Sequence, residues 1–289
     1  LDPKKRLELA EKMDNDRFRQ LARLVGPMIQ HALGAQREKV RHNPEEIYDI
    51  EMGDDLAHIL PSEWAYLAHP MFKVDFLRRF MEKSLPQYVL RGTEKEAQGG
   101  IISVTDGSLS MGGQREIWAM ATSLALLRLA KNQNRPFTGI QFGGPGTYRK
   151  WVFDTSGKGL GCVLTGSDID GEKKFSGIDA IIDFAGTFLN SGTDFQTPFN
   201  VAIEQLKAEH ASHGAVKGDI VFITDGECSV SEKWKEEYFE TQKELGFKVF
   251  GVAIATAAST EPLNELCGGN VLGVTELVAS TPRSIFGEL

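Results

Sequence analysis

Short apolar segments alternate with longer amphipathic segments from about residue 99 onward, and this alternation restricts the possible folds more than any other feature. Residues 101–105 predict a strand, and residues 114–132 predict a helix with one apolar face. The other predicted strands are 138–142, 151–153, 219–224, 248–255 and 270–274, and the other predicted helices are 178–189, 198–209 and 232–245. Strands that alternate with helices predict a doubly wound α/β fold, with a mostly parallel sheet covered on both faces.

Residues 1–98 predict a separate helical region that precedes this α/β domain of residues 99–289. Apolar residues recur there at helical spacing, at Phe18, Leu21, Val25, Met28 and Ala32. Gly26 and Pro27 fall inside this stripe, so we expect the helix to be kinked or divided there. Gly53-Asp54-Asp55 resembles a cap before a helix that starts at Leu56, and a further helix is predicted over residues 74–85.

The segment 157–175 is rich in Gly, Ser and Asp and lacks a clear periodicity. It predicts an inserted loop or hairpin, whose role the sequence does not reveal.

The charge balance excludes one large class of function. The chain has 289 residues with 32 Lys and Arg against 40 Asp and Glu, which gives a net charge of -8. A nucleic-acid-binding protein normally carries a basic patch that neutralises phosphates, and no such patch is evident here. An acidic domain is better suited to binding cations.

The cysteine pattern indicates a reducing compartment. The three cysteines, Cys162, Cys228 and Cys267, are an odd number without a CxxC pair, which disfavours a disulfide framework or a structural zinc site. No apolar run approaches the ~20 residues of a membrane span, and no signal peptide is recognised. We therefore expect a cytoplasmic protein, although the chain opens at Leu1 and an N-terminal segment could be missing.

Three separate segments carry oxygen-bearing side chains at positions where a doubly wound sheet binds ligands. They are residues 106–110 (DGSLS) after the first strand, 191–194 (SGTD) between two helices, and 223–227 (ITDGE) at the end of a later strand. The carboxyl ends of parallel strands form one edge of the sheet, so we expect the segments to meet there, exposed to solvent. Carboxylate and hydroxyl oxygens favour Mg²⁺, Mn²⁺ or Ca²⁺ over zinc, and Mg²⁺ suits a site with few protein ligands. The alternative is that these are ordinary turn residues.

These residues resemble the metal-ion-dependent adhesion site (MIDAS) of von Willebrand factor type A (VWA) domains. DGSLS matches the DxSxS signature, SGTD resembles the threonine loop, and the end of FITDG resembles the distal aspartate. The resemblance implies that Ser108 and Ser110 bind the metal directly, that Thr193 binds directly or through water, and that Asp106 and Asp225 act chiefly through waters. The usual loop of the family is DTSGS, so Gly107 and Leu109 are departures, and the bulky Leu109 would alter the rim of the site.

A further resemblance, from about residue 18 to 277, is to bacterial CoxE-like and ViaA-like VWA proteins. It rests on the motif together with upstream segments at residues 44–46 (PEE), 52–56 (MGDDL) and 60–63 (LPSE). Those proteins work with MoxR-type AAA+ ATPases. The resemblance implies an adaptor or substrate-recognition subunit without enzymatic activity, whose metal binds an acidic side chain of the partner.

Two other classes of function remain open. A secreted adhesin would bind surface ligands, and a metal-dependent hydrolase would need a general base beside an activated water, yet no His accompanies the motif. Other polar positions are weaker signals that we interpret as surface or bystander residues: Asp168 and Asp170 of a DIDG segment, His210 and His213, and Cys228. Asp194 and Glu227 lie beside the motif in sequence, and we expect them to support the metal ligands or to be solvated.

Overall fold

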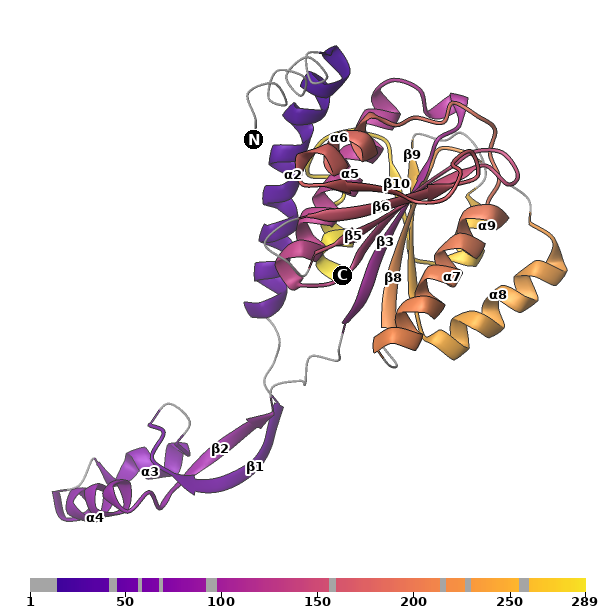
Figure 1. Ribbon diagram of the computed structural model, residues 1–289. Helices are drawn as coiled ribbons and strands as arrows, with labels where there is room; N and C mark the ends of the chain where they lie inside the picture. The colour runs from indigo at the N-terminus through magenta and orange to yellow at the C-terminus, as the bar shows by residue number, and fades with distance from the viewer. Residues whose placement is uncertain are drawn as a thin grey trace. The chain divides into compact units, whose positions relative to one another are not determined.

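The computed structural model describes residues 15–41, 46–56, 59–67, 70–91, 98–155, 160–213, 217–226, 230–254 and 260–289. The chain forms two compact units (Figure 1): the larger combines Leu1–Val40 with Ala97–Leu289, and the smaller is Arg41–Glu96. The boundary predicted at residue 98 therefore differs from the observed division, because the first described helix packs in the core of the larger unit.

The larger unit is built on an eight-stranded sheet in the order β10-β9-β8-β3-β4-β5-β6-β7. The strands are β3 (Gln98–Asp106), β4 (Phe137–Phe142), β5 (Tyr148–Asp154), β6 (Gly161–Gly166), β7 (Lys173–Ser176), β8 (Lys217–Thr224), β9 (Lys248–Ile254) and β10 (Val271–Val274). Neighbours from β10 to β4 are parallel, whereas β5, β6 and β7 continue the sheet antiparallel. The segment predicted as an inserted loop or hairpin is thus largely the β6–β7 pair.

Helices cover both faces of this sheet. They are α2 (Asp16–Arg41), α5 (Gln114–Gln133), α6 (Ile178–Gly186), α7 (Gln196–His213), α8 (Glu232–Leu245), α9 (Glu261–Leu266) and α10 (Arg283–Glu288). Successive residues of β3 point to opposite faces, so Ile101 joins one core and Ile102 the other. The first core contains residues of α2, α5, α6 and α10, and the second contains residues of α7, α8 and α9. The predicted doubly wound fold is confirmed.

Helix α2 is an integral part of the first core. Leu21, Met28 and Ala32 are buried along one side of it, at helical spacing. The helix continues through Pro27, so the chain is not divided there. None of the helices in the described ranges is long and apolar enough to cross a membrane.

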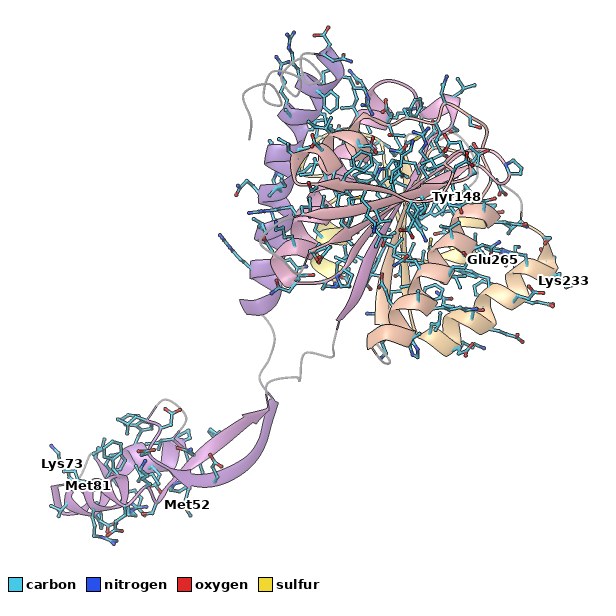
Figure 2. All side chains as sticks on the ribbon, viewed as in Figure 1. Met52, Lys73, Met81, Tyr148, Lys233 and Glu265 are labelled. Carbon is cyan, nitrogen blue, oxygen red and sulfur yellow. The ribbon has the colours of Figure 1, made fainter. Side chains whose placement is uncertain are left out.

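The smaller unit contains an antiparallel pair, β1 (Glu46–Gly53) and β2 (Leu85–Arg91), and two helices, α3 (Pro61–Tyr66) and α4 (Pro70–Met81). Its small core consists of Ile59, Phe76 and Leu85. The carboxylate of Glu63 pairs with Arg79 at 2.9 Å, with both side chains largely buried. Several of its large apolar side chains are exposed to solvent, among them Met52 and Met81 (Figure 2).

The prediction of an entirely helical N-terminal region is wrong for the two strands of the smaller unit. Helical spacing is a local signal, whereas β1 is stabilised by pairing with β2, which lies far along the chain. Gly53 ends a strand, and the backbone N–H of Asp55 donates to Oε1 of Gln87 at 2.9 Å. Gly53 is therefore the last residue of a strand that Asp54 and Asp55 follow, and no helix starts at Leu56.

Close packing of β4 against α6 predicts a specific sensitivity at Gly139. A Cβ atom there would lie 2.5 Å from the ring of Phe184. That ring cannot move aside easily because it is fully buried and contacts three other rings, those of Phe137, Trp151 and Phe153. We expect Gly139→Ala to lower the free energy of unfolding by about 1–3 kcal/mol through overpacking, as measured by urea denaturation.

Gly273→Ala on β10 is the matched control, because a Cβ atom at Gly273 meets no atom within 4 Å. Its expected effect is below about 0.5 kcal/mol. Equal losses in the two variants would contradict the packing described at Gly139.

Candidate metal centre

Two aspartates lie at the carboxyl ends of two neighbouring strands. Asp106 is the last residue of β3, and Asp225 directly follows Thr224, the last residue of β8. The two strands are paired in parallel, with Thr105 opposite Ile223. The predicted convergence of these segments at one edge of the sheet is therefore observed.

The hydroxyl groups of the DGSLS loop connect the loop to the second aspartate. The Oγ atoms of Ser108 and Ser110 are 3.0 Å apart. Ser110 Oγ also donates a hydrogen bond of 2.8 Å to Oδ1 of Asp225. A short 3-10 helix, η1 (Leu109–Met111), directly follows Ser108 and contains Ser110. Oxygens from two segments of the chain thus lie in mutual contact.

Asp106 is enclosed by protein. Its side chain accepts a 2.8 Å hydrogen bond from the backbone N–H of Ser108 at Oδ1 and a 2.5 Å hydrogen bond from Thr224 Oγ1 at Oδ2. Burial raises the pKa of Asp106 above its ordinary value, and the nearby charge of Asp225 acts in the same direction. The ionised form is held by the two donors, which oppose that shift.

The expectation of an exposed site is wrong for three of the five predicted residues. Asp106, Ser108 and Asp225 are only 1%, 3% and 7% exposed, whereas Ser110 is exposed and Thr193 is half-buried. The cause is that the loops close over the strand ends by backbone contacts. The N–H of Leu109 donates to the carbonyl of Ser191, and the N–H of Ser191 donates to the carbonyl of Gly107.

The third predicted segment, residues 191–194, also reaches the site. A side chain at Gly226, next to Asp225, would meet Thr193 Cγ2 at 3.6 Å and Thr193 Oγ1 at 3.8 Å. Thr193 therefore lies beside the end of β8. Asp194, which follows it, caps α7 by accepting from the backbone N–H groups of Gln196 and Thr197.

Two glycines allow this close approach. A Cβ atom at Gly107 would lie 2.9 Å from the carbonyl oxygen of Phe142, and one at Gly143 would lie 2.6 Å from Cβ of Ser191. The N–H of Gly107 donates to that same carbonyl at 2.7 Å. Gly107, a departure from the usual DTSGS loop, is thus explained by its contact with the end of β4. The other departure, Leu109, is 68% exposed at the rim.

Arg115 belongs to the site, and sequence reasoning missed it. It lies in the first turn of α5, and its Nη1 is 2.5 Å from Oδ2 of Asp225 and 3.3 Å from the carbonyl oxygen of Ser110. A charged residue at the start of a helix is usually solvated. Its proximity to the DGSLS loop in sequence was the available signal.

The other polar residues singled out in the sequence have different surroundings, and two of them fall outside the described residues. Asp168 pairs with Arg149, which lowers the pKa of the Asp168 carboxyl. Glu227 and Cys228 fall in the segment 227–229, which the structure does not describe. Within the described ranges, no group of three or more His, Cys, Asp or Glu side chains could hold a metal, so a metal at this centre would depend on the hydroxyls.

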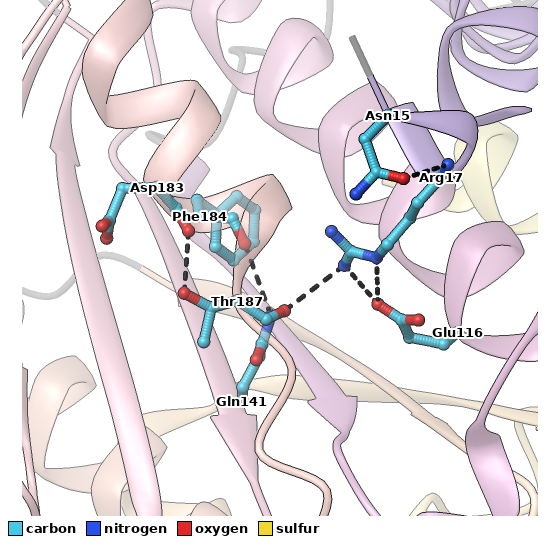
Figure 3. A network of polar contacts seen from close by, with 7 residues as sticks. All are labelled: Asn15, Arg17, Glu116, Gln141, Asp183, Phe184 and Thr187. Carbon is cyan, nitrogen blue, oxygen red and sulfur yellow. Dashed lines mark hydrogen bonds and ion pairs between the residues drawn. The ribbon is translucent and has the colours of Figure 1, made fainter. Parts of the chain in front are cut away.

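A polar network supports the segment that leads to Ser191 (Figure 3). The carbonyl of Thr187 accepts from Nε2 of Gln141 at 3.0 Å and from Nη2 of Arg17 at 3.5 Å. Arg17, on α2, also donates from Nε to Oε1 of Glu116 at 2.9 Å. Glu116 is buried and adjacent to Arg115 on α5. Helix α2 is therefore bonded to two segments that shape the site.

Solved structures with a low similarity to this chain include a mussel byssus protein and a von Willebrand factor type A protein. Proximal thread matrix protein 1 from the mussel byssus is 16% identical, with a TM-score of 0.45 over 66% of this chain and 48% of its own. A second structure of that protein has a zinc-occupied MIDAS motif. A von Willebrand factor type A protein from Catenulispora acidiphila is 15% identical, with a TM-score of 0.45 over 70% of this chain and 43% of its own.

Sequence relatives cover this chain from end to end. No family model matches the chain. The uncharacterized protein MJ0811 of Methanocaldococcus jannaschii is 30% identical over 99% of this chain, which spans 60% of that protein. The uncharacterized protein MJ0077 of the same organism is 31% identical over 100% of this chain, which spans 67% of that relative. The chain belongs to the family of MJ0077.

Proposed function

We propose that the chain is a protein-binding module of the VWA type, whose binding depends on a divalent cation, Mg²⁺, at Asp106, Ser108, Ser110, Thr193 and Asp225. The observation that carries the proposal is the contact of Ser108 Oγ with Ser110 Oγ at 3.0 Å and of Ser110 Oγ with Asp225 Oδ1 at 2.8 Å. Three oxygens from two strand ends are already gathered there.

These separations fit the requirements of the ion. With Mg²⁺–oxygen distances of 2.0–2.1 Å, adjacent ligands of an octahedron lie about 2.9 Å apart. The 3.0 Å spacing of the two serine hydroxyls, which are the proposed direct ligands, agrees with that value. Ser108 and Ser110 would hold the ion directly, Thr193 directly or through water, and the two aspartates chiefly through water.

The same residues favour binding of an acidic partner. Neutral hydroxyls leave most of the positive charge of a bound cation uncompensated, and the cation would supply a position that a partner's carboxylate can occupy. Ser110 and Leu109 are exposed, so this side of the site is accessible to another protein. Leu109 would contact an apolar side chain beside the partner's carboxylate.

We further propose that the partner is a MoxR-type AAA+ ATPase, which the chain serves as an adaptor for a third protein. This rests on the resemblance to CoxE-like and ViaA-like proteins in residues 18–277, and it implies a cytoplasmic location. The smaller unit offers a second surface independent of the metal, with exposed apolar side chains such as Met52, Val74 and Met81.

Ser110 is the cleanest position at which to test metal binding. Asp106 is a poor choice, because its removal would leave two buried donors, the N–H of Ser108 and the hydroxyl of Thr224, without an acceptor. Ser110 is exposed, so its loss affects the metal-free fold less.

Saturating Mg²⁺ is expected to raise the melting temperature of the wild-type chain by about 5–10 °C relative to EDTA. At a hundred times its dissociation constant, a ligand adds about 2.7 kcal/mol of stability, and each kcal/mol corresponds to about 2–4 °C for a domain of this size. Ser110→Ala should lose most of this difference. Ser176→Ala, an exposed serine on β7, should keep it, and identical melting of the wild type with EDTA and Mg²⁺ would refute metal binding.

Partner capture tests the second part of the proposal. Wild-type, Ser110→Ala and Ser176→Ala chains serve as bait in a lysate of the source cells, each with Mg²⁺ and with EDTA, and captured proteins are identified by mass spectrometry. An AAA+ ATPase is expected with the wild type and Ser176→Ala in Mg²⁺ and should be depleted in the other samples. Absence of an ATPase, or equal recovery in every sample, would overturn this partnership.

A further inference from the structure

Arg115 brings a positive charge next to a proposed metal ligand, where it would repel a bound cation. Its Nη1 lies 2.5 Å from Oδ2 of Asp225, and Oδ1 of the same carboxylate accepts the hydroxyl of Ser110. The side chain of Asp225 is only 1% exposed, whereas that of Arg115 is 38% exposed. One cation from the protein itself is therefore paired with a proposed metal ligand.

The ion pair has a clear role when no metal is bound. A carboxylate removed from water is costly unless a positive charge or hydrogen bonds compensate it, and Asp106 adds a second buried carboxylate at the same edge of the sheet. Among the described residues, Arg115 is the cationic side chain that pairs with Asp225. It also donates to the carbonyl of Ser110 and so braces the loop that carries both serines.

We propose that Arg115 is an internal cation that competes with the divalent metal for Asp225 and thereby sets the metal affinity of the site. This inference rests on the proposed function. A positive charge beside a carboxylate weakens the affinity of that carboxylate for any other cation, because the two cations repel each other. Repulsion scales with charge, so it acts more strongly on a divalent ion at the same separation. The Arg115 side chain is partly exposed, so it can move away from Asp225 and be solvated when a metal binds.

Isothermal titration calorimetry of the complete chain with MgCl₂ and with MnCl₂ tests the competition. Arg115→Gln, which removes the charge, is expected to bind either metal about tenfold or more tightly than the wild type. Arg115→Lys, which keeps the charge, should stay close to the wild-type affinity. Arg128→Ala is the matched control, because Arg128 is exposed on the same helix, about 20 Å further along it.

A second readout does not depend on the metal. In EDTA, Arg115→Gln should melt below the wild type, because Asp225 loses its counter-charge, and Arg128→Ala should not. Arg115→Ala provides a second neutral variant if the glutamine variant folds poorly. Unchanged or weaker metal binding by the neutral variants, with binding by the wild type intact, would overturn the role of Arg115 alone. If neither the wild type nor the neutral variants bind metal, the proposed function fails and this inference fails with it.

Discussion

The parallel pairing of β3 with β8 places two carboxylates at one edge of the sheet, and the remaining features of the centre depend on that pairing. Asp106 is almost fully buried, and each of its carboxylate oxygens accepts a hydrogen bond, Oδ1 from the backbone of Ser108 and Oδ2 from the hydroxyl of Thr224. The penalty for burying an ionised carboxylate is several kcal/mol even after relaxation. A fold that buries two of them side by side needs positive charge at the same place, and in the described residues Arg115 provides it.

Backbone contacts then determine the shape of the site. The carbonyls of Gly107 and Ser191 each accept an N–H from the opposite loop, so the DGSLS loop and the threonine loop are joined directly. Side chains at Gly107 or Gly143 would obstruct this approach. The hydroxyls of Ser108 and Ser110 are consequently preorganised by the main chain, and little rearrangement is needed for them to share a ligand.

Much of this could be predicted from the sequence, because the relevant signals are local. The long helix after the DGSLS loop has a sustained helical period, and the strands before Asp106 and Asp225 are short apolar runs. The strands β1 and β2 were missed because their pairing is non-local, and polar edge strands such as β7 have no apolar period to detect. Burial of Asp106 and the role of Arg115 depend on loop packing across the sheet edge, which residue spacing does not encode.

The smaller unit is an insertion in the larger one, since the chain leaves after α2 and returns at β3. A gene fragment that starts at β3 would look like a complete domain, yet it would lack α2. Removing α2 would uncover the apolar surface against which Leu21, Met28 and Ala32 pack, and it would also remove Arg17 from the network around Thr187. Such a fragment should aggregate, as exposed apolar patches commonly do. A shortened protein that replaces Arg41–Glu96 with a flexible linker retains the helices of the larger unit, so the excisable piece is internal to that unit in sequence.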